Sequence, residues 1–186
     1  YRGITLNNIM AKIYSKLLVE RLSKWAEKHN TLIDNRYGFQ KGKSTVDCIF
    51  ILHALITKNI SKQEKIYTAF LDFGKMFDTI DRIYLWQKLL NTNVSTRFVR
   101  AVKAMYSSEK APLYISLYEC IFSNVGVKQG DPRSSLLCLF FLNDILDNID
   151  TNIPGLLDID DLKIFLLLFA DDAVLFAENP LSFSYY

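Results

Sequence analysis

The chain is poor in the residues that build disulfide frameworks and zinc centres. Only 3 of its 186 residues are cysteine and 2 are histidine. The cysteines, at positions 48, 120 and 138, form no close pairs and lie in apolar stretches, as is typical of buried thiols in a reducing compartment. The two histidines are isolated from one another. We therefore expect neither disulfides nor a zinc site.

Long hydrophobic runs are also missing. The longest apolar stretches, LLCLFFL and LKIFLLLFA, fall well short of the roughly 20 residues that a helix needs to cross a bilayer. No charged-then-apolar signal segment opens the sequence. We expect a soluble, intracellular protein with no membrane partner. Because the chain starts at Tyr1 rather than at a methionine, we also expect it to be a fragment of a longer protein.

Charge is distributed unevenly along the chain, although the formal net charge is only +2. Residues 1–110 contain 19 Lys and Arg against 9 Asp and Glu, whereas residues 111–186 contain 3 against 11. A basic first half suits contact with a polyanion, and an acidic second half suits a cation. Solvated helix faces explain the basic residues equally well. Hydrophobic residues make up 50%, which is enough for one core of domain size.

The sequence pattern predicts five helices. Apolar residues recur at intervals of three and four in segments 5–28, 45–59 and 95–106. Two more helices are predicted over 81–90 and 136–149, each behind residues that can cap a helix. Asp78 and Asp81 are predicted to cap the helix over 81–90, and Ser134 or Ser135 the helix over 136–149.

The remaining segments predict a small sheet. IYTAFL (66–71) is rich in aromatic and β-branched residues and reads as a buried strand, and residues 112–127 alternate well enough for two short strands. The acidic segment 151–161 is predicted to be a surface loop, and the chain closes with a hairpin. Helices segregated against a small, mostly antiparallel sheet make an α+β domain.

Three aspartates occupy the ends of the predicted strands. Asp72 ends the apolar run IYTAFL, and Asp171 and Asp172 lie between LKIFLLLFA and AVLFA, about a hundred residues later. Such carboxylates repel one another unless a cation lies between them, and Mg²⁺ prefers hard carboxylate oxygens. Two ions roughly 3.5 to 4 Å apart can stabilise an in-line phosphoryl displacement. Nucleotidyl transfer is the first hypothesis, and a solvated hairpin turn at the doublet is the alternative.

Five segments, in order, resemble a known family. LDFGKMFDTIDR, GVKQGDP and LFADDAVLF resemble the palm motifs of reverse transcriptases from non-LTR (LINE-type) retrotransposons. YRGITL and YGFQKGKSTVDCIF resemble the finger motifs that precede them. The resemblance implies a right-hand polymerase fold without its thumb, with a fingers-like part at 1–65 and a palm-like part at 66–186. It implies two Mg²⁺ ions, or Mn²⁺ as a substitute, an RNA template, a DNA primer, deoxynucleotide triphosphates and a nuclear location.

The same resemblance assigns roles to individual residues. Asp72, Asp171 and Asp172 match the catalytic, metal-binding carboxylates. Phe77 matches an aromatic gate that would clash with a ribose 2′-OH, although an ordinary core phenylalanine is the alternative. The other matched positions are predicted to bind the nucleotide (Phe73, Gln129 and Gly130) or to contact template or phosphate (Lys41 and Lys43). A solvated loop explains the two lysines as well as phosphate contact does.

Some residues depart from the family pattern. The family usually has Cys at Asp131, Leu at Arg133 and Pro at Ser135, a small alanine at Met76 and often an arginine at Gln40. A carboxylate at 131 is expected to repel the triphosphate by on the order of 1 kcal/mol, or more if dry, so reduced activity is predicted.

Three alternative functions remain open at this point. A catalytically silent, palm-like module that binds nucleic acid is favoured by Asp131, Arg133 and the missing thumb. An RNA-copying polymerase that makes RNA would share the paired acids, but Phe77 argues against it. A simple carboxylate cation-binding protein predicts metal affinity that is indifferent to nucleotide.

Overall fold

The chain divides into two compact units, each assembled from two separate segments. The computed structural model describes residues 5–32, 37–38, 42–107, 111–112, 120–121, 125–145, 157–159 and 162–181. The first unit comprises Tyr1–Trp25 and Lys75–Phe141, and the second comprises Ala26–Gly74 and Leu142–Tyr186. The predicted division into fingers-like and palm-like parts at residue 65 stays a prediction.

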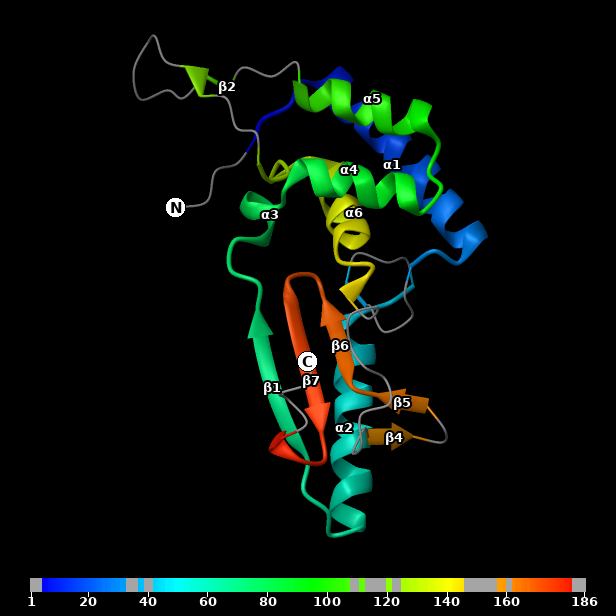
Figure 1. The fold of residues 1–186 in the computed structure, drawn as a ribbon, viewed down its shortest axis with the longest axis vertical. Helices are drawn as coiled ribbons and strands as arrows, with labels where there is room; N and C mark the ends of the chain where they lie inside the picture. Colours follow the sequence, from blue (N-terminus) through cyan, green and yellow to red (C-terminus); the bar gives the residue numbers. More distant parts are fainter. Residues whose placement is uncertain are drawn as a thin grey trace. The chain divides into compact units, whose positions relative to one another are not determined.

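A three-stranded antiparallel sheet forms the centre of the second unit. Its strands are β1 (Tyr67–Asp72), β6 (Leu166–Phe169) and β7 (Asp172–Ala177), and β7 lies between the other two (Figure 1). β6 and β7 form the predicted closing hairpin, with Phe169 opposite Asp172. β1 pairs with the outer side of β7, from Tyr67 opposite Ala177 to Asp72 opposite Asp172. The sheet therefore joins two segments that are distant in the sequence.

Alternation along the strands gives the sheet two apolar faces. On one face, Leu167 and Phe176 pack with Leu55 of α2 (Thr45–Ser61), and all three are fully or almost fully buried. The other face carries a second buried cluster: Phe165, Leu166, Leu168, Ala173 and Leu175. Because the hairpin is buried on both sides, its strands read as continuous hydrophobic runs rather than as strictly alternating ones.

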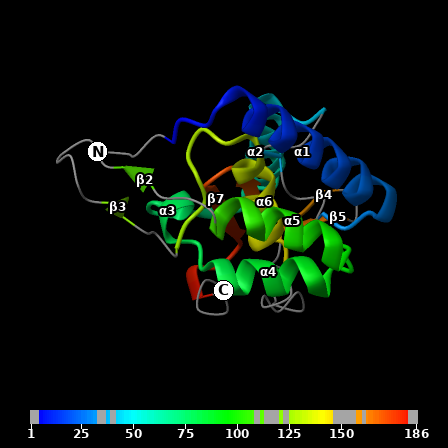
Figure 2. The ribbon, with the colours of Figure 1, turned by 90° about the horizontal axis from the view of Figure 1, so that it is seen from above.

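The first unit is helical. It contains α3 (Met76–Thr79), α4 (Arg82–Asn91), α5 (Thr96–Ser107), α6 (Pro132–Phe141) and most of α1 (Ile9–His29), and α4 contacts both α5 and α6 (Figure 2). Asp81 begins α4 as predicted, because its carboxylate accepts hydrogen bonds from the backbone N of Ile83 and Tyr84. The ring of Trp86 packs edge-on against that of Tyr106, with centroids 5.6 Å apart, and joins α4 to α5.

The prediction for the start of α6 was wrong. The helix begins at Pro132, so Ser134 and Ser135 lie inside it, and it ends at Phe141. Asp131 makes the contact of an N-cap residue instead, since its Oδ1 accepts a hydrogen bond from the backbone N of Arg133 at 2.9 Å. Proline suits the first helical position because its missing N–H would have no partner there.

The segment predicted to be a loop over 151–161 also differs. Residues 157–159 form β4 (Leu157–Ile159), which pairs antiparallel with β5 (Leu162–Ile164). Two short strands were predicted over 112–127. The structure has two short paired strands there, β2 (Ala111–Pro112) and β3 (Cys120–Ile121), and most of the remaining range lies outside the described residues. The prediction of helices with a small antiparallel sheet is confirmed. No helix in the described ranges has the length and apolar character that crossing a bilayer requires.

Candidate active site

The three acids come together at one end of the sheet in the second unit. Asp72 is the last residue of β1, and its register partner is Asp172, the first residue of β7. Asp171 lies in the turn of the hairpin, where its carbonyl accepts a hydrogen bond from the backbone N of Phe73 at 3.1 Å. Figure 1 shows the tip of the β6–β7 hairpin beside the end of β1. Antiparallel pairing thus brings the early aspartate to the later doublet.

The pairing geometry sets Asp72 and Asp172 close to one another. Phe73 and Asp171 are joined by a backbone hydrogen bond, so the adjacent pair, Asp72 and Asp172, is a non-hydrogen-bonded pair. Such pairs have Cα atoms about 4.5 Å apart, with both side chains on the same face. Like charges directly opposite one another are destabilising, and both carboxylates are exposed to solvent. A cation bound between them would remove this repulsion.

The turn that carries the doublet has an unusual backbone. Only Ala170 and Asp171 separate the paired residues Phe169 and Asp172. Ala170 has a φ of +57°, in the left-handed region that favours glycine, and a positive φ at the first central position suits a type II′ turn. A non-glycine residue there costs free energy and persists only where its surroundings hold it.

The acids offer the right donors for Mg²⁺ but do not form a closed cage. In the part of the chain that the structure describes, no group of three or more His, Cys, Asp and Glu side chains is arranged to hold a metal ion. Mg²⁺ commonly takes one or two protein carboxylates and fills its remaining positions with water and substrate phosphates. An exposed carboxylate pair with a third carboxylate on the adjoining turn fits that donor set.

The predicted nucleotide residues fall in both units. Phe73, in the second unit, is partly buried against the cluster of Leu166 and Leu168. Phe77, in the first unit, belongs to α3, where its carbonyl accepts a hydrogen bond from the backbone N of Val127 at 2.6 Å.

The loop 126–130 is held against α3 within the first unit. Gln129 Nε2 donates a hydrogen bond to Asp78 Oδ1 at 3.2 Å, and the carbonyl of Gln129 accepts one from the backbone N of Thr5 at 2.9 Å. Gly130 has a φ of +95°, which requires glycine. The prediction that Asp78 caps the next helix was wrong, because Asp78 lies inside α3 and positions Gln129.

Of the two basic positions, the structure describes one. Lys43 Nζ lies 4.9 Å from the centroid of the Tyr37 ring, a cation–π contact that leaves its predicted role at phosphate or template a prediction. Lys41 and Gln40 lie outside the described residues.

Asp131 is not the unpaired carboxylate that the sequence analysis expected. It is buried, as is Arg133, whose Nε donates to Asp131 Oδ1 at 2.9 Å and whose Nη2 forms an ion pair with Oδ2. Asn7 Nδ2 donates to the same Oδ2 at 2.9 Å. Burial acts to raise the pKa of Asp131, but the hydrogen bonds from Arg133 and Asn7 outweigh it and hold the pKa below its usual range. The two departures from the family pattern therefore neutralise one another.

Comparison with known proteins decides the family. A model described as reverse transcriptase (RNA-dependent DNA polymerase) matches residues 1–183. The chain belongs to the reverse transcriptase family. The resemblance to enzymes of non-LTR retrotransposons is confirmed by the relatives of this reverse transcriptase chain.

Those relatives are polyproteins and polymerases of insect elements. The chain is 25% identical over 181 residues to the retrovirus-related Pol polyprotein from type-1 retrotransposable element R2 of Nasonia vitripennis, covering 96% of this chain and 17% of that protein. The R2 polyprotein of Popillia japonica is 27% identical over 187 residues, with 96% and 25% covered. The probable RNA-directed DNA polymerase from transposon BS of Drosophila melanogaster is 25% identical, with 96% and 19% covered. The reverse transcriptase chain thus spans about a quarter or less of the curated relatives it matches.

One solved structure shares the fold. Apo telomerase from Candida tropicalis, truncated from its C-terminal domain, aligns with a TM-score of 0.56 at 13% identity, covering 94% of this chain and 35% of that one. At this identity the likeness concerns the fold of the reverse transcriptase chain alone.

Next to the Asp131–Arg133 pair, three cations surround one aromatic ring. Arg82, Lys128 and Arg133 lie 4.8, 5.0 and 5.2 Å from the centroid of the Tyr106 ring. Lys128 is buried, and its Nζ donates to the carbonyl of Met105 at 3.3 Å. Burial, reinforced by repulsion from Arg133, lowers the pKa of Lys128 to about 8.

This lowered pKa predicts an unusual pH dependence of stability. Between pH 8 and the ordinary pKa of 10.5, the unfolded chain holds a proton on Lys128 that the folded chain releases. The free energy of unfolding should therefore rise with pH in that window, by up to about 1 kcal/mol from pH 8 to pH 9. Urea denaturation of the wild type and Lys128→Met at both pH values checks this.

Comparing the wild type with Lys128→Met separates the effect of Lys128 from that of other groups that titrate in the same pH range. The pKa values of Tyr106 and Cys48 are both raised by burial, so their ionisation lowers stability as pH increases in both proteins. The wild type should gain more, or lose less, stability than Lys128→Met. Equal pH slopes in the two proteins would contradict the prediction.

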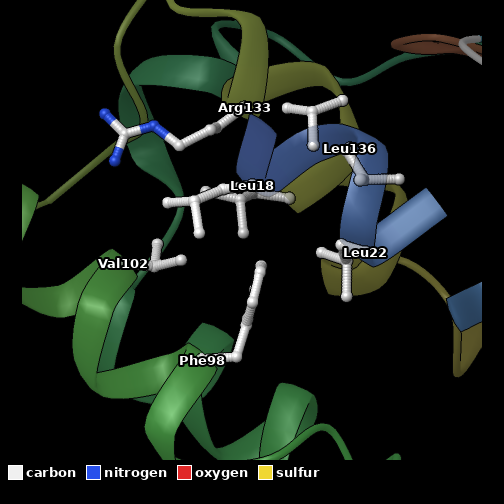
Figure 3. A pocket seen from close by; sticks show the side chains of 8 residues that line it. Leu18, Leu22, Phe98, Val102, Arg133 and Leu136 are labelled. Atoms are coloured by element: carbon white, nitrogen blue, oxygen red, sulfur yellow. The ribbon is translucent and has the colours of Figure 1, made fainter. Parts of the chain in front are cut away.

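A pocket in the helical core of the first unit is too small for a substrate. It has a volume of about 10 Å³, room for about one water molecule, between α1, α5 and α6. Its lining is mainly apolar: Leu18, Val19, Leu22, Phe98, Val102, Arg133, Leu136 and Leu137. Figure 3 shows the Arg133 stem beside these side chains and its guanidinium directed away from them. The pocket is a packing defect of the helical core.

Proposed function

We propose that this reverse transcriptase domain adds deoxynucleotides to a DNA primer along an RNA template, and that it adopts the fingers and palm of a right-hand polymerase. The observation that carries the proposal is the register pairing of Asp72 with Asp172, beside Asp171 in the adjoining turn. These acids occur in segments that resemble the motifs of the family, in the same order along the chain. Phosphoryl transfer needs alignment and charge neutralisation more than covalent help from protein groups.

The proposed metal ligands are these three aspartates. Reverse transcriptase domains generally use divalent ions, and we propose two Mg²⁺, with Mn²⁺ as a substitute. When bound, the ions would neutralise charge on the transferring phosphate and on the attacking and leaving oxygens. Asp72 and Asp172 contribute a fixed pair of exposed carboxylates, because a continuous ladder of backbone pairing holds their strands.

The residues that match the family's nucleotide-binding and template-binding positions are proposed to select and orient the nucleotide. Phe77 would exclude a ribose 2′-OH by shape, and Gln129, held by Asp78, would orient the incoming nucleotide. Gly130 would let the backbone approach the substrate closely. Phe73 would contribute its backbone near the triphosphate, and Lys41 and Lys43 would contact phosphate or template.

Single-nucleotide primer extension tests the proposal. A labelled DNA primer annealed to an RNA template should gain the complementary deoxynucleotide in the presence of Mg²⁺, and chelation with EDTA should stop the reaction. The experiment is best run with the chain alone and with a protein extended to the length of its relatives. Binding of the primer–template without incorporation in either protein would favour the silent palm-like module.

The gate role of Phe77 predicts a change in sugar selectivity. Phe77→Ala removes a stiff aromatic wall, so the ratio of kcat/KM for a ribonucleotide to that for the matching deoxynucleotide should rise on the order of 10- to 100-fold. Phe98→Ala, at a partly buried phenylalanine on α5 in the same unit, serves as the control for lost packing. An unchanged ratio in Phe77→Ala would contradict the gate role and favour the alternative that Phe77 is an ordinary core residue.

A further inference from the structure

Gly38 lies against the turn that carries the aspartate doublet. The backbone N of its neighbour Tyr37 donates a hydrogen bond to the carbonyl of Leu168 at 2.8 Å, which places this short segment alongside β6. Gly38 itself is buried. Both residues and the whole β6–β7 hairpin belong to the second unit.

No side chain fits at position 38. A Cβ atom there would lie 2.1 Å from the backbone N of Ala170, 2.9 Å from its Cα and 3.0 Å from the carbonyl carbon of Phe169. All three are backbone atoms, so no rotamer change relieves the clash. Ordinary van der Waals contact begins at 3.4 Å, so the segment or the turn would have to move by more than about 1 Å.

Neither partner can move away easily. The side chain of Tyr37 packs against the buried cluster that contains Leu167 and Phe176, and this packing holds the segment in place. The turn is held on its other side by the hydrogen bond from Phe73 to Asp171. Ala170 already has a left-handed backbone, which its surroundings must maintain.

We propose that Gly38 is a positioning residue for the metal-binding acids. Its lack of a side chain lets the Tyr37–Gly38 segment pack directly against the turn, and this contact fixes Asp172 opposite Asp72 and Asp171 in the adjoining turn. The inference rests on the proposed function, since it assigns Gly38 to the same site. Sequence motifs alone gave no such role, because the close approach joins segments about 130 residues apart.

The test compares Gly38→Ala with Gly42→Ala in the 186-residue chain. Gly42 has a φ of +81°, so alanine there is also strained, but its Cβ would meet nothing within 4 Å. Gly42→Ala therefore reproduces the loss of a glycine without touching the turn. Mn²⁺ titration, followed by electron paramagnetic resonance, should show affinity at least about tenfold weaker in Gly38→Ala and unchanged in Gly42→Ala. Equal affinities in the two variants would overturn the proposal.

A structural measurement keeps the test decisive if Gly38→Ala unfolds or if Mn²⁺ does not bind. In the wild type, the α protons of Gly38 should give nuclear Overhauser effects to the amide proton of Ala170, and their absence would overturn the inference. In folded Gly38→Ala, the amide of Phe73 should exchange faster with solvent than in Gly42→Ala. Mn²⁺ binding that is unaffected by Asp171→Asn would instead overturn the proposed metal site, and the amide exchange would still decide the role of Gly38.

Discussion

Asp171→Asn should reduce nucleotide incorporation by on the order of 10²- to 10³-fold or more, while leaving the domain folded. The substitution keeps the shape of the side chain and the backbone carbonyl that accepts the hydrogen bond from Phe73. It removes one negative charge from a group of three that is proposed to hold the metal ions. Because the lost charge belongs to a repelling cluster, the free energy of unfolding should stay the same or increase.

A matched control separates the site from general charge effects. Glu178 is exposed and directly follows the end of β7 that lies away from the acids, so Glu178→Gln removes the same charge at a distance from them. Primer extension and urea denaturation should be measured for both variants. The metal site is refuted if Asp171→Asn retains incorporation within tenfold of Glu178→Gln at equal stability.

The sequence predicted the acidic residues of the site better than it predicted the contacts that hold them in place. The doublet between two apolar runs indicated a hairpin, and the run IYTAFL indicated a strand that ends in Asp72. That strand was expected to be buried, and this was wrong, because Phe70 is 72% exposed and Leu71 is 44% exposed. Local pattern cannot specify that β1 pairs with β7, because that pairing joins segments about a hundred residues apart. The ordered family motifs supplied this long-range information.

Each error has an identifiable physical cause. The start of α6 was missed because serines were preferred as caps, although Asp131 before Pro132 is the stronger signal of an N-cap followed by the first helical position. Asp78 was predicted to cap a helix because an aspartate just before a helical segment usually does so. Its actual partner, Gln129, is distant in the sequence, and local pattern does not reveal such a contact. The same holds for Gly38, whose role depends on a backbone that approaches from a distant strand.

Arg133 and Asp131 were each interpreted alone, and their pairing leads to the second large prediction. Arg133→Leu restores the residue that the family usually has, yet it should lower the free energy of unfolding by about 3–5 kcal/mol, because Asp131 would stay buried without its cation. Asp131→Cys alone should be comparably harmful, because it leaves the guanidinium buried. Chemical denaturation of each single variant measures both costs.

The double variant Asp131→Cys/Arg133→Leu should recover most of that loss, since replacing both partners of a buried ion pair by apolar groups is often neutral. Lys24→Met, which breaks an exposed pair with Glu20 on α1, should leave the denaturation midpoint unchanged and serves as the control. A double variant whose loss equals the sum of the two single losses would show no coupling. Recovery would mean that the substitutions at 131 and 133 compensate one another in the fold, so that neither is by itself a sign of a defective reverse transcriptase.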